Sequence, residues 1–386
     1  MTFDRPYWIM ASQYFLYFGV LGIFLPYFNL YCHHLGFGGF EIGVLSGLRS
    51  MTLVVFSIAW SILADHFQAR RRIYILCNLI SVAVWLGYLF TTEFRVMFWI
   101  TLIYGLFFGP IIAFMEAFTI DLLKDQKERY GQIRAWGTIA FIVVVAGLGR
   151  LTDFYPIRII LLFVFAGSLC QALLALGVPG AVSTRRIRFR DGAAHLKNRG
   201  TAVVLCAGFL MLASHGTYYG LFSIHLEALG YSRTFIGFAW ALASVAEILV
   251  MIRSRQIFGE APLKPLLVMA CIVAALRWII LSAFGSPIAV ISAQLLHAAT
   301  YACFHIASIL YIDRQFPEGA KTLGQAVNNA VGYGLGMMIG FLVNGVLYER
   351  VGAERLFLVS AGIALSAAML LEWGLPSTRN ATRPTL

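Results

Sequence analysis

Two opposite charges lie on neighbouring apolar segments in the first half of this chain. Glu116 belongs to an apolar run that ends near residue 120, and Arg134 lies just inside the next run. Charges on segments apolar enough to span a membrane are costly, and they are kept where a pathway or a partner uses them. We therefore interpret Glu116 and Arg134 as candidate binding residues. For Glu116 the alternative is a structural charge near the inner end of its helix.

Three further charged or titratable side chains lie at similar depth in three apolar segments of the second half. At about 1.5 Å per residue, Glu247 lies roughly 18 Å, Arg277 roughly 20 Å and His297 roughly 15 Å into its predicted helix. A buried carboxylate and a buried imidazole can both bind and release protons, so Glu247 and His297 are candidates for proton coupling. The alternative is an ion pair between Glu247 and Arg277 that only fixes packing.

Polar and aromatic groups near these positions extend the candidate site. His305 follows His297 by eight residues, roughly 80° around a helix, so the two histidines can share a face and pass protons. His215, Tyr218 and Tyr219 lie within five residues and suit an aromatic or hydroxylated ligand. Ordinary packing is the alternative for His305 and for this group.

Arg49 lies within an apolar segment and has no matching acid in the sequence. A buried arginine without a partner favours an anionic ligand or an acid from across the bundle. Arg49 is the main reason to expect an acid and not a neutral sugar.

The elements that carry these residues are long apolar helices. Of the 386 residues, 60% are hydrophobic and 12% are charged, about half the charged fraction of a soluble protein. A bilayer core requires about 20 apolar residues per helix. By this measure an all-α membrane protein of twelve transmembrane helices is predicted, at roughly 8–31, 41–63, 73–92, 96–120, 132–151, 156–178, 200–226, 235–257, 264–284, 287–312, 323–347 and 354–374.

A polar, basic segment divides the chain into two six-helix halves, the layout of a transporter built from two repeats. We expect an N-terminal bundle at 1–180, a cytoplasmic linker at 181–199, a C-terminal bundle at 200–378 and a cytoplasmic tail at 379–386. With both termini inside, 20 of the 29 lysines and arginines lie in inner segments and 6 in outer ones. This asymmetry predicts that both termini are cytoplasmic, and the topology explains the net charge better than nucleic-acid binding does.

Other motifs are absent or concern helix packing. No nucleophile, metal cluster or phosphate loop stands out, so we expect no enzyme activity, no catalytic residue, no metal and no cofactor apart from a coupling proton. Gly109 and Pro110 predict a kink in the fourth helix. Glycines at four-residue spacing in the eleventh helix predict close approach of a neighbouring backbone: Gly332, Gly336 and Gly340, with Gly334 between them.

The segment SILADHFQARRRI, residues 61–73, resembles the signature loop of the major facilitator superfamily. Asp65 and the basic residues Arg70, Arg71 and Arg72 match, whereas Ser61 and Gln68 replace the usual glycines. A carboxylate at one helix end that pairs with basic residues at the next would make the two helices gate together. The alternative is a solvated basic loop.

A closer resemblance covers nearly the whole chain. YFGVLGIFLPYF and YGQIRAWGTIAFI are similar to the lactose permease and phenylpropionate permease branch of proton symporters, and SHGTYYG, SVAEILV, ALRWII and LLHAATYACFH are similar to the phenylpropionate permeases. The resemblance implies that Glu116 and Arg134 hold the solute and that Phe141 replaces a stacking tryptophan. It also implies coupling roles for the second-half group of Glu247, Arg277 and His297.

This chain departs from the lactose permease at three coupling positions. Thr300 replaces the acid that releases the proton, and Gln294 and Tyr333 replace nearby basic residues. A lactose-type proton relay is therefore incomplete, and any proton must be carried differently.

Together these patterns predict a secondary transporter in the inner membrane with a central site between its halves, which takes up a small organic solute with protons. An aromatic carboxylate such as 3-phenylpropionate is the first candidate solute and a saccharide the second. Export of a drug or metabolite, or a receptor without transport, are the remaining alternatives. A monomer suffices for this architecture, and the expected partners are the solute, the proton and the lipid bilayer.

Overall fold

The computed structural model describes residues 5–123, 129–179, 193–259, 261–317 and 320–376, and their regular secondary structure is helical. The chain forms two compact units: residues 1–185 with 222–241, and residues 186–221 with 242–386. The helix α8, Arg199–Ala228, therefore belongs partly to each unit. The domain boundaries expected from the sequence stay a prediction.

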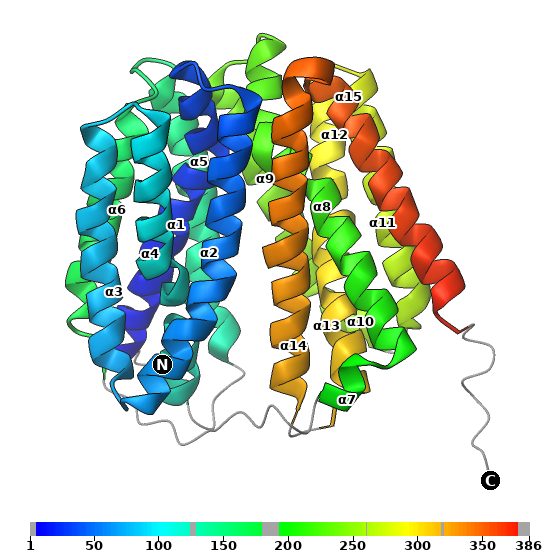
Figure 1. Ribbon diagram of the computed structural model, residues 1–386, viewed down its shortest axis with the longest axis horizontal. Coiled ribbons are helices and arrows are strands. Elements are labelled where there is room, and N and C mark those ends of the chain that lie inside the picture. Colours follow the sequence, from blue (N-terminus) through cyan, green and yellow to red (C-terminus); the bar gives the residue numbers. More distant parts are fainter. Residues whose placement is uncertain (1–4, 124–128, 180–192, 260, 318–319, 377–386) are drawn as a thin grey trace. The chain divides into compact units, whose positions relative to one another are not determined.

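The first unit is a bundle of six helices together with parts of two more (Figure 1). The six are α1 Arg5–His34, α2 Gly39–His66, α3 Arg70–Trp85, α4 Phe94–Leu123, α5 Tyr130–Thr152 and α6 Ile159–Ala175, and the 3-10 turn η1, Leu86–Leu89, extends α3. The last part of α8 and the first part of α9, Arg233–Ile252, complete this unit.

The second unit contains the remaining helices. Two short helices are α7, Ala193–Leu196, and α10, Ser254–Phe258. The longer ones are α11 Leu263–Ala283, α12 Pro287–His297, α13 Phe304–Gln315, α14 Lys321–Asn329 and α15 Met337–Gly374. Two π-helical segments join them into longer runs: η3, Ala298–Cys303, connects α12 to α13, and η4, Ala330–Gly336, connects α14 to α15.

In the described residues each of the twelve predicted spans corresponds to a helical run. Ten runs are long and apolar enough to cross a membrane, and α6 is a shorter apolar helix of 17 residues. The longest run, Lys321–Gly374, holds the last two predicted spans, which meet at Gly352. Its φ of 74° lies where glycine is favoured, and the orange and red rods of Figure 1 are the two parts. The predicted fold class is confirmed.

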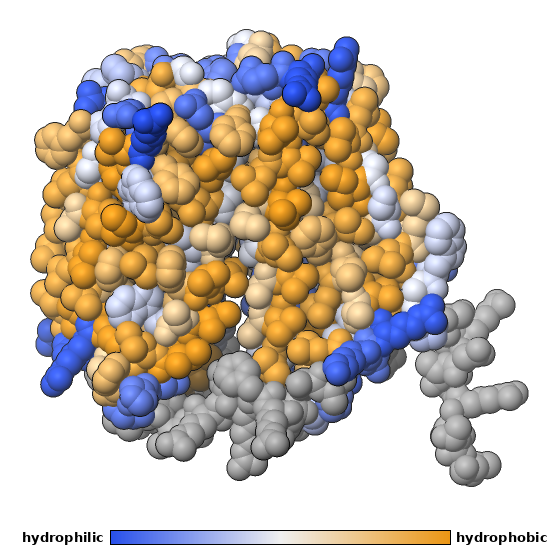
Figure 2. Space-filling view, viewed as in Figure 1, coloured by the Kyte–Doolittle hydropathy of each residue, from blue (hydrophilic) through white to orange (hydrophobic). Residues whose placement is uncertain are grey.

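Apolar side chains cover the lateral surfaces of the helices, and hydrophilic side chains gather at the helix ends (Figure 2). Val143, near the middle of α5, and Trp99, in the second turn of α4, are each 59% exposed. Apolar surface on this scale suits lipid and not water. The chain is a multi-pass membrane protein.

The proline of α4 is accommodated without a break in the helix. Pro110 has no N–H, so the carbonyl of Leu106 loses its helical donor. The indole Nε1–H of Trp60, in α2, donates to that carbonyl at 2.8 Å, and the Ser57 hydroxyl donates to the Gly109 carbonyl at 2.7 Å. A side chain of the neighbouring helix thus supplies a donor to the carbonyl that the proline leaves without one.

The glycines of the predicted eleventh helix do allow close backbone contact. A Cβ at Gly336 would lie 2.6 Å from the carbonyl oxygen of Phe209, and one at Gly340 would lie 2.5 Å from that of Ala213. Both carbonyls belong to α8, so two helices of the second unit touch backbone to backbone. At Gly332 the nearest atom is a Leu212 side-chain carbon at 3.7 Å, an ordinary contact.

Replacement of Gly340 tests this contact. We expect Gly340→Val to lower the free energy of unfolding by about 1–3 kcal/mol, because the added atoms overlap the α8 backbone. Gly362→Val is the matched control, since nothing lies within 4 Å of a Cβ there. Thermal unfolding in detergent should show a lower midpoint for the first variant and little change for the second. Equal midpoints would contradict the packing described here.

Candidate solute and proton site

A chain of hydrogen bonds connects Arg277, His297 and Glu247 in the second unit. The Arg277 Nε donates to the Ala293 carbonyl at 2.8 Å, and its Nη1 lies 2.8 Å from His297 Nδ1. The His297 Nε2 lies 2.9 Å from Glu247 Oε1. The structure thus brings together the three residues that the sequence placed at one depth.

The donor and acceptor roles in this chain follow from Arg277. A guanidinium only donates, so His297 Nδ1 must accept, and its Nε2 carries the hydrogen that faces the carboxylate of Glu247. His297 is therefore held as a neutral imidazole with one defined tautomer. It fixes the position of Glu247, and it cannot take a proton on Nδ1 without losing its bond to Arg277.

Exposure separates the three residues. Arg277 and His297 are 0% and 2% exposed, whereas the Glu247 side chain is 19% exposed. Glu247 is the member of the chain that a proton from solvent can reach directly. Among the two residues that the sequence proposed for proton binding, this geometry favours Glu247.

A layer of neutral groups surrounds the guanidinium. The Tyr218 hydroxyl donates to Gln294 Oε1 at 2.9 Å, and Arg277 Nη2 donates to the same oxygen at 3.3 Å. The guanidinium also lies over the rings of Tyr218 and Trp278, at 4.2 and 4.5 Å from their centroids. Thr300, which replaces the acid of the lactose permease, donates to the His297 carbonyl at 3.2 Å.

The two π-helical segments add tyrosines that sequence reasoning missed as site residues. Tyr301 of η3 stacks on His297 with ring centroids 5.2 Å apart, and it meets Tyr333 of η4 at 5.9 Å. The Tyr333 hydroxyl lies 2.8 Å from His305 Nδ1. His305 and Tyr333 therefore belong to the same cluster as the predicted coupling residues. A sequence signal for Tyr301 was its position four residues after His297.

His215 contributes a buried nitrogen without a partner. Its ring is 1% exposed, and its Nδ1 lies 2.8 Å from the Met211 carbonyl, which can only accept. Nε2 is therefore an acceptor, and it has no hydrogen-bond partner among the described residues. The ring lies between those of Trp278 at 4.9 Å and Tyr301 at 6.0 Å.

The predicted pair of the first unit is arranged differently. Glu116 in α4 lies within electrostatic range of Arg134 in α5 and beside the hydroxyl of Tyr130. Arg134 packs over an aromatic ring, 3.8 Å from the centroid of Phe18 and 5.7 Å from that of Tyr14. The two charges are thus close, and the guanidinium rests mainly on the rings of α1.

Phe141 and Arg49 both contact α1 within the first unit. A Cβ at Gly22 would lie 3.0 Å from the Phe141 carbonyl oxygen and 3.4 Å from its ring, so Phe141 marks a close approach of α1 and α5. The Arg49 guanidinium lies 4.5 Å from the centroid of the Phe24 ring. No acidic side chain lies within ion-pair distance of Arg49 in the part of the chain that the structure describes.

The charged loop between α2 and α3 forms the contact expected from its motif. Arg70 Nε donates to Asp65 Oδ1 at 2.6 Å, which connects the end of α2 to the start of α3. Arg71 donates to two main-chain carbonyls just beyond α6, and Arg72 is exposed. A gating role for these residues stays a prediction.

Gln68 shows why this motif usually has a glycine. Its φ is 49°, in the left-handed region that side chains rarely adopt. Its amide nitrogen donates to the Asp65 carbonyl at 2.7 Å, which stabilises the turn without a glycine. Gln68 thus adopts, without a glycine, a left-handed conformation that glycine adopts most readily.

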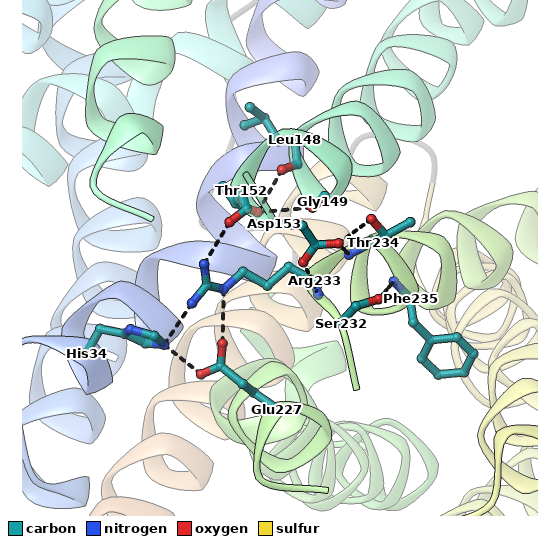
Figure 3. A network of polar contacts seen from close by, with 10 residues as sticks. All are labelled: His34, Leu148, Gly149, Thr152, Asp153, Glu227, Ser232, Arg233, Thr234 and Phe235. Atoms are coloured by element: carbon teal, nitrogen blue, oxygen red, sulfur yellow. Dashed lines mark hydrogen bonds and ion pairs between the residues drawn. The ribbon is translucent and has the colours of Figure 1, made fainter. Parts of the chain in front are cut away.

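A second polar network, not predicted from the sequence, joins the ends of four helices in the first unit (Figure 3). Arg233, at the start of α9, lies at its centre. Its Nε donates to Glu227 at 3.0 Å and its Nη1 to the Thr152 carbonyl at 2.7 Å. His34, at the end of α1, lies 2.6 Å from the other oxygen of Glu227.

Asp153 binds the first turn of α9 from the end of α5. It accepts from the main-chain N–H of Arg233 at 2.8 Å and of Thr234 at 3.1 Å, a favourable position for an anion. Although partial burial raises the pKa of Asp153, the hydrogen bonds from Thr234 and Arg233 hold it below its ordinary value. The contact therefore contributes its full stability above the ordinary pKa of an aspartate, and this stability is lost only as the pH falls through the lowered pKa.

The helices below this network pack closely. A Cβ at Gly149 of α5 would lie 2.5 Å from the Arg233 carbonyl, and one at Gly237 of α9 would lie 2.5 Å from the Val145 carbonyl. The Tyr27 hydroxyl of α1 donates to that same carbonyl at 2.7 Å. The network thus lies over a crossing of α1, α5 and α9 that admits no larger side chains.

The helical fold and its buried charged chains are typical of a membrane transporter. The sequence matches the MFS_1 like family over residues 7–359, and the chain belongs to that family. It is therefore a secondary transporter of the major facilitator superfamily and not an enzyme.

Individual relatives differ in the solutes that their names give. The chain is 29% identical over 399 residues to the "Probable 3-phenylpropionic acid transporter" of Escherichia coli, covering 98% of this chain and 100% of that protein. It is 26% identical to the maltose permease of Geobacillus stearothermophilus, over 89% of each chain. The crystal structure of the nucleoside transporter NupG matches with a TM-score of 0.84 at 18% identity, covering 97% of this chain and 100% of that one.

A double-variant cycle tests the chain of Arg277, His297 and Glu247. We expect Arg277→Met to lower the free energy of unfolding by about 3–5 kcal/mol, since it leaves the carboxylate without its cation. Glu247→Gln added to Arg277→Met should recover part of that loss, because it removes the uncompensated charge. Unfolding of the wild type, both single variants and the double variant in detergent gives the coupling. Strictly additive losses in the free energy of unfolding would contradict coupling through this hydrogen-bonded chain.

Hydrogen exchange tests the second network. We expect Arg233→Gln to speed amide exchange at the end of α5 and in the first turns of α9, because Glu227 and the Thr152 carbonyl lose a charged donor. Arg150→Gln is the matched control, since Arg150 is exposed and packs on the ring of Phe154. Unchanged exchange in Arg233→Gln, or an equal rise in both variants, would contradict a stabilising role for Arg233.

Proposed function

We propose that the protein is a proton-coupled symporter that takes up a small organic acid, with an aromatic carboxylate such as 3-phenylpropionate as the first candidate. The observation that carries this proposal is the buried chain of Arg277, His297 and Glu247, in which one fixed cation and one reachable carboxylate share a neutral imidazole.

The net charge of this hydrogen-bonded group links the binding of a proton to the binding of an anion. With Glu247 ionised, its charge cancels that of Arg277, and the group is neutral. When Glu247 takes a proton, the buried guanidinium is left without a counter-charge, which favours entry of an anion in a site of low dielectric. The anion in turn favours the protonated state. Proton and carboxylate then bind together, and one of each crosses the membrane without net charge.

An aromatic carboxylate is supported by two observations. The relative from Escherichia coli whose name gives 3-phenylpropionic acid aligns over its full length. Arg49 supplies a further cation in the first unit, packed on the ring of Phe24 and without an acid in ion-pair contact among the described residues.

A saccharide is the second candidate solute. The similarity to a maltose permease supports it, as does the proximity of Glu116 and Arg134, which the resemblance to lactose permease assigns to sugar binding. Glu247 would remain the proton-binding residue in that case.

The remaining expectations complete the proposal. Both termini would be cytoplasmic, the membrane would be the inner membrane, and a monomer would suffice. Transport would proceed by alternating access.

Reconstituted protein tests the proposal. Liposomes that hold a pH-sensitive dye should acidify internally when 3-phenylpropionate is added outside, beyond the rate in protein-free liposomes. Glu247→Gln should abolish accumulation against a gradient, because the proton-binding carboxylate is gone. Glu372→Gln is the matched control, since Glu372 pairs with Lys264 and its side chain is 57% exposed.

The outcomes distinguish the two solutes. Acidification with a galactoside or maltose alone would retain the coupling and replace the solute. Accumulation that survives in Glu247→Gln would show that another group carries the proton.

A further inference from the structure

Among the described residues of the second unit two segments are π-helical, and each carries one tyrosine of the same cluster. η3 begins directly after His297 and contains Tyr301, and η4 contains Tyr333. A π-helix makes a wider turn than an α-helix, so it displaces the side chains that follow it around the axis. Such segments are rare in proteins, and a large share of them lie at functional sites.

The tyrosines of these segments form an aromatic cluster with residues of α8 and α13. The ring of Tyr301 lies 6.1 Å from that of Tyr219 and 5.9 Å from that of Tyr333, both edge to face. The rings of His305 and Tyr333 lie 5.5 Å apart, also edge to face. The cluster of Tyr219, Tyr301, His305 and Tyr333 thus presents rings at several angles.

Exposure distinguishes this cluster from the layer behind it. All four of its members are partly exposed. The residues behind them are almost fully buried: Arg277, Gln294, Tyr218 and His297. A solute that enters the second unit would therefore contact the aromatic cluster and the exposed part of the Glu247 side chain before it could contact the buried layer.

Glu247 lies within electrostatic range of the cluster. Its charge acts on His305, Tyr219 and Tyr333. The aromatic cluster and the proton-binding carboxylate are therefore neighbours, so one small solute can occupy the cluster and influence Glu247.

The unpartnered nitrogen of His215 is an independent sign of a ligand position. Its ring lies 6.0 Å from that of Tyr301 and 6.4 Å from that of Tyr219, and its Nε2 is a buried acceptor with no partner in the described residues. A buried acceptor without a donor is costly in a packed core. A hydroxyl group on a bound solute would satisfy it, whereas an ionised carboxylate, which only accepts, would not.

We propose that Tyr301 and Tyr333, positioned by the two π-helical segments, form with Tyr219 and His305 a subsite that binds the aromatic ring of the solute. Aromatic rings prefer the edge-to-face and offset contacts that these side chains present, and a saturated ring has no such preference. This inference deepens the proposed function, on which it rests for the solute as an organic acid. The ring contact itself does not depend on proton coupling.

Matched pairs of ligands test the subsite. The affinities of 3-phenylpropionate and 3-cyclohexylpropionate are compared by ligand-induced thermal stabilisation of the purified protein, as are those of phenyl glucoside and cyclohexyl glucoside. In at least one pair we expect the wild type to bind the aromatic member about tenfold more tightly. Tyr301→Leu and Tyr333→Leu should each reduce that preference to near one.

Two control variants separate ring contact from folding. Tyr301→Phe retains the ring and should retain the preference. Tyr348→Leu removes a partly exposed tyrosine of α15 that lies outside the cluster and should also retain it. If either control variant lost the preference, the effect would not be specific to the rings of the cluster, and the proposal would be wrong.

The remaining outcomes separate this inference from the proposed function. A preference in the glucoside pair alone, lost in the two leucine variants of the cluster, supports the aromatic subsite and rejects the organic acid as solute. No preference in either pair, or a preference that survives in both of those leucine variants, overturns the subsite. That result does not bear on proton coupling through Glu247, which the liposome experiment tests separately.

Discussion

The burial of the Arg277 guanidinium is the constraint on which the second unit depends. A cation that is 0% exposed must have its donors satisfied. The Ala293 carbonyl, His297 and Gln294 accept from it, and two aromatic rings lie against its faces. These demands fix the tautomer of His297 and thereby the position of Glu247. A carboxylate held in this way can change its charge while the framework around it remains in place, which is what coupling requires.

The two units hold their charges by different means. In the second unit, Glu247 lies at the end of a hydrogen-bonded chain that begins at Arg277. In the first unit, Arg134 and Arg49 rest on the rings of Phe18 and Phe24. A guanidinium on an aromatic face remains available to a solute anion in a way that a fully hydrogen-bonded guanidinium does not.

Much of the architecture was predictable, because a bilayer imposes strong rules on a sequence. The twelve spans followed from the length of apolar runs, and Glu247, Arg277 and His297 were found because charges at mid-depth are rare. Tyr301 and Tyr333 were not recognised as a pair, since the turn of a π-helix has no simple pattern in the sequence. Arg233 and Asp153 were missed because residues at helix ends resemble ordinary loop charges, and only the three-dimensional arrangement shows that they meet.

The class of protein, its helices and the residues whose charges required an explanation could all be read from the sequence alone. These are local properties, set by the hydropathy and length of each segment. Three features are visible only in the folded protein: which nitrogen of His297 carries a hydrogen, that Glu247 is the exposed end of its hydrogen-bonded chain, and that two π-helical segments bring tyrosines together. Hydrogen-bond roles and ring contacts depend on distances between separate helices, and those distances are set only when the helices pack.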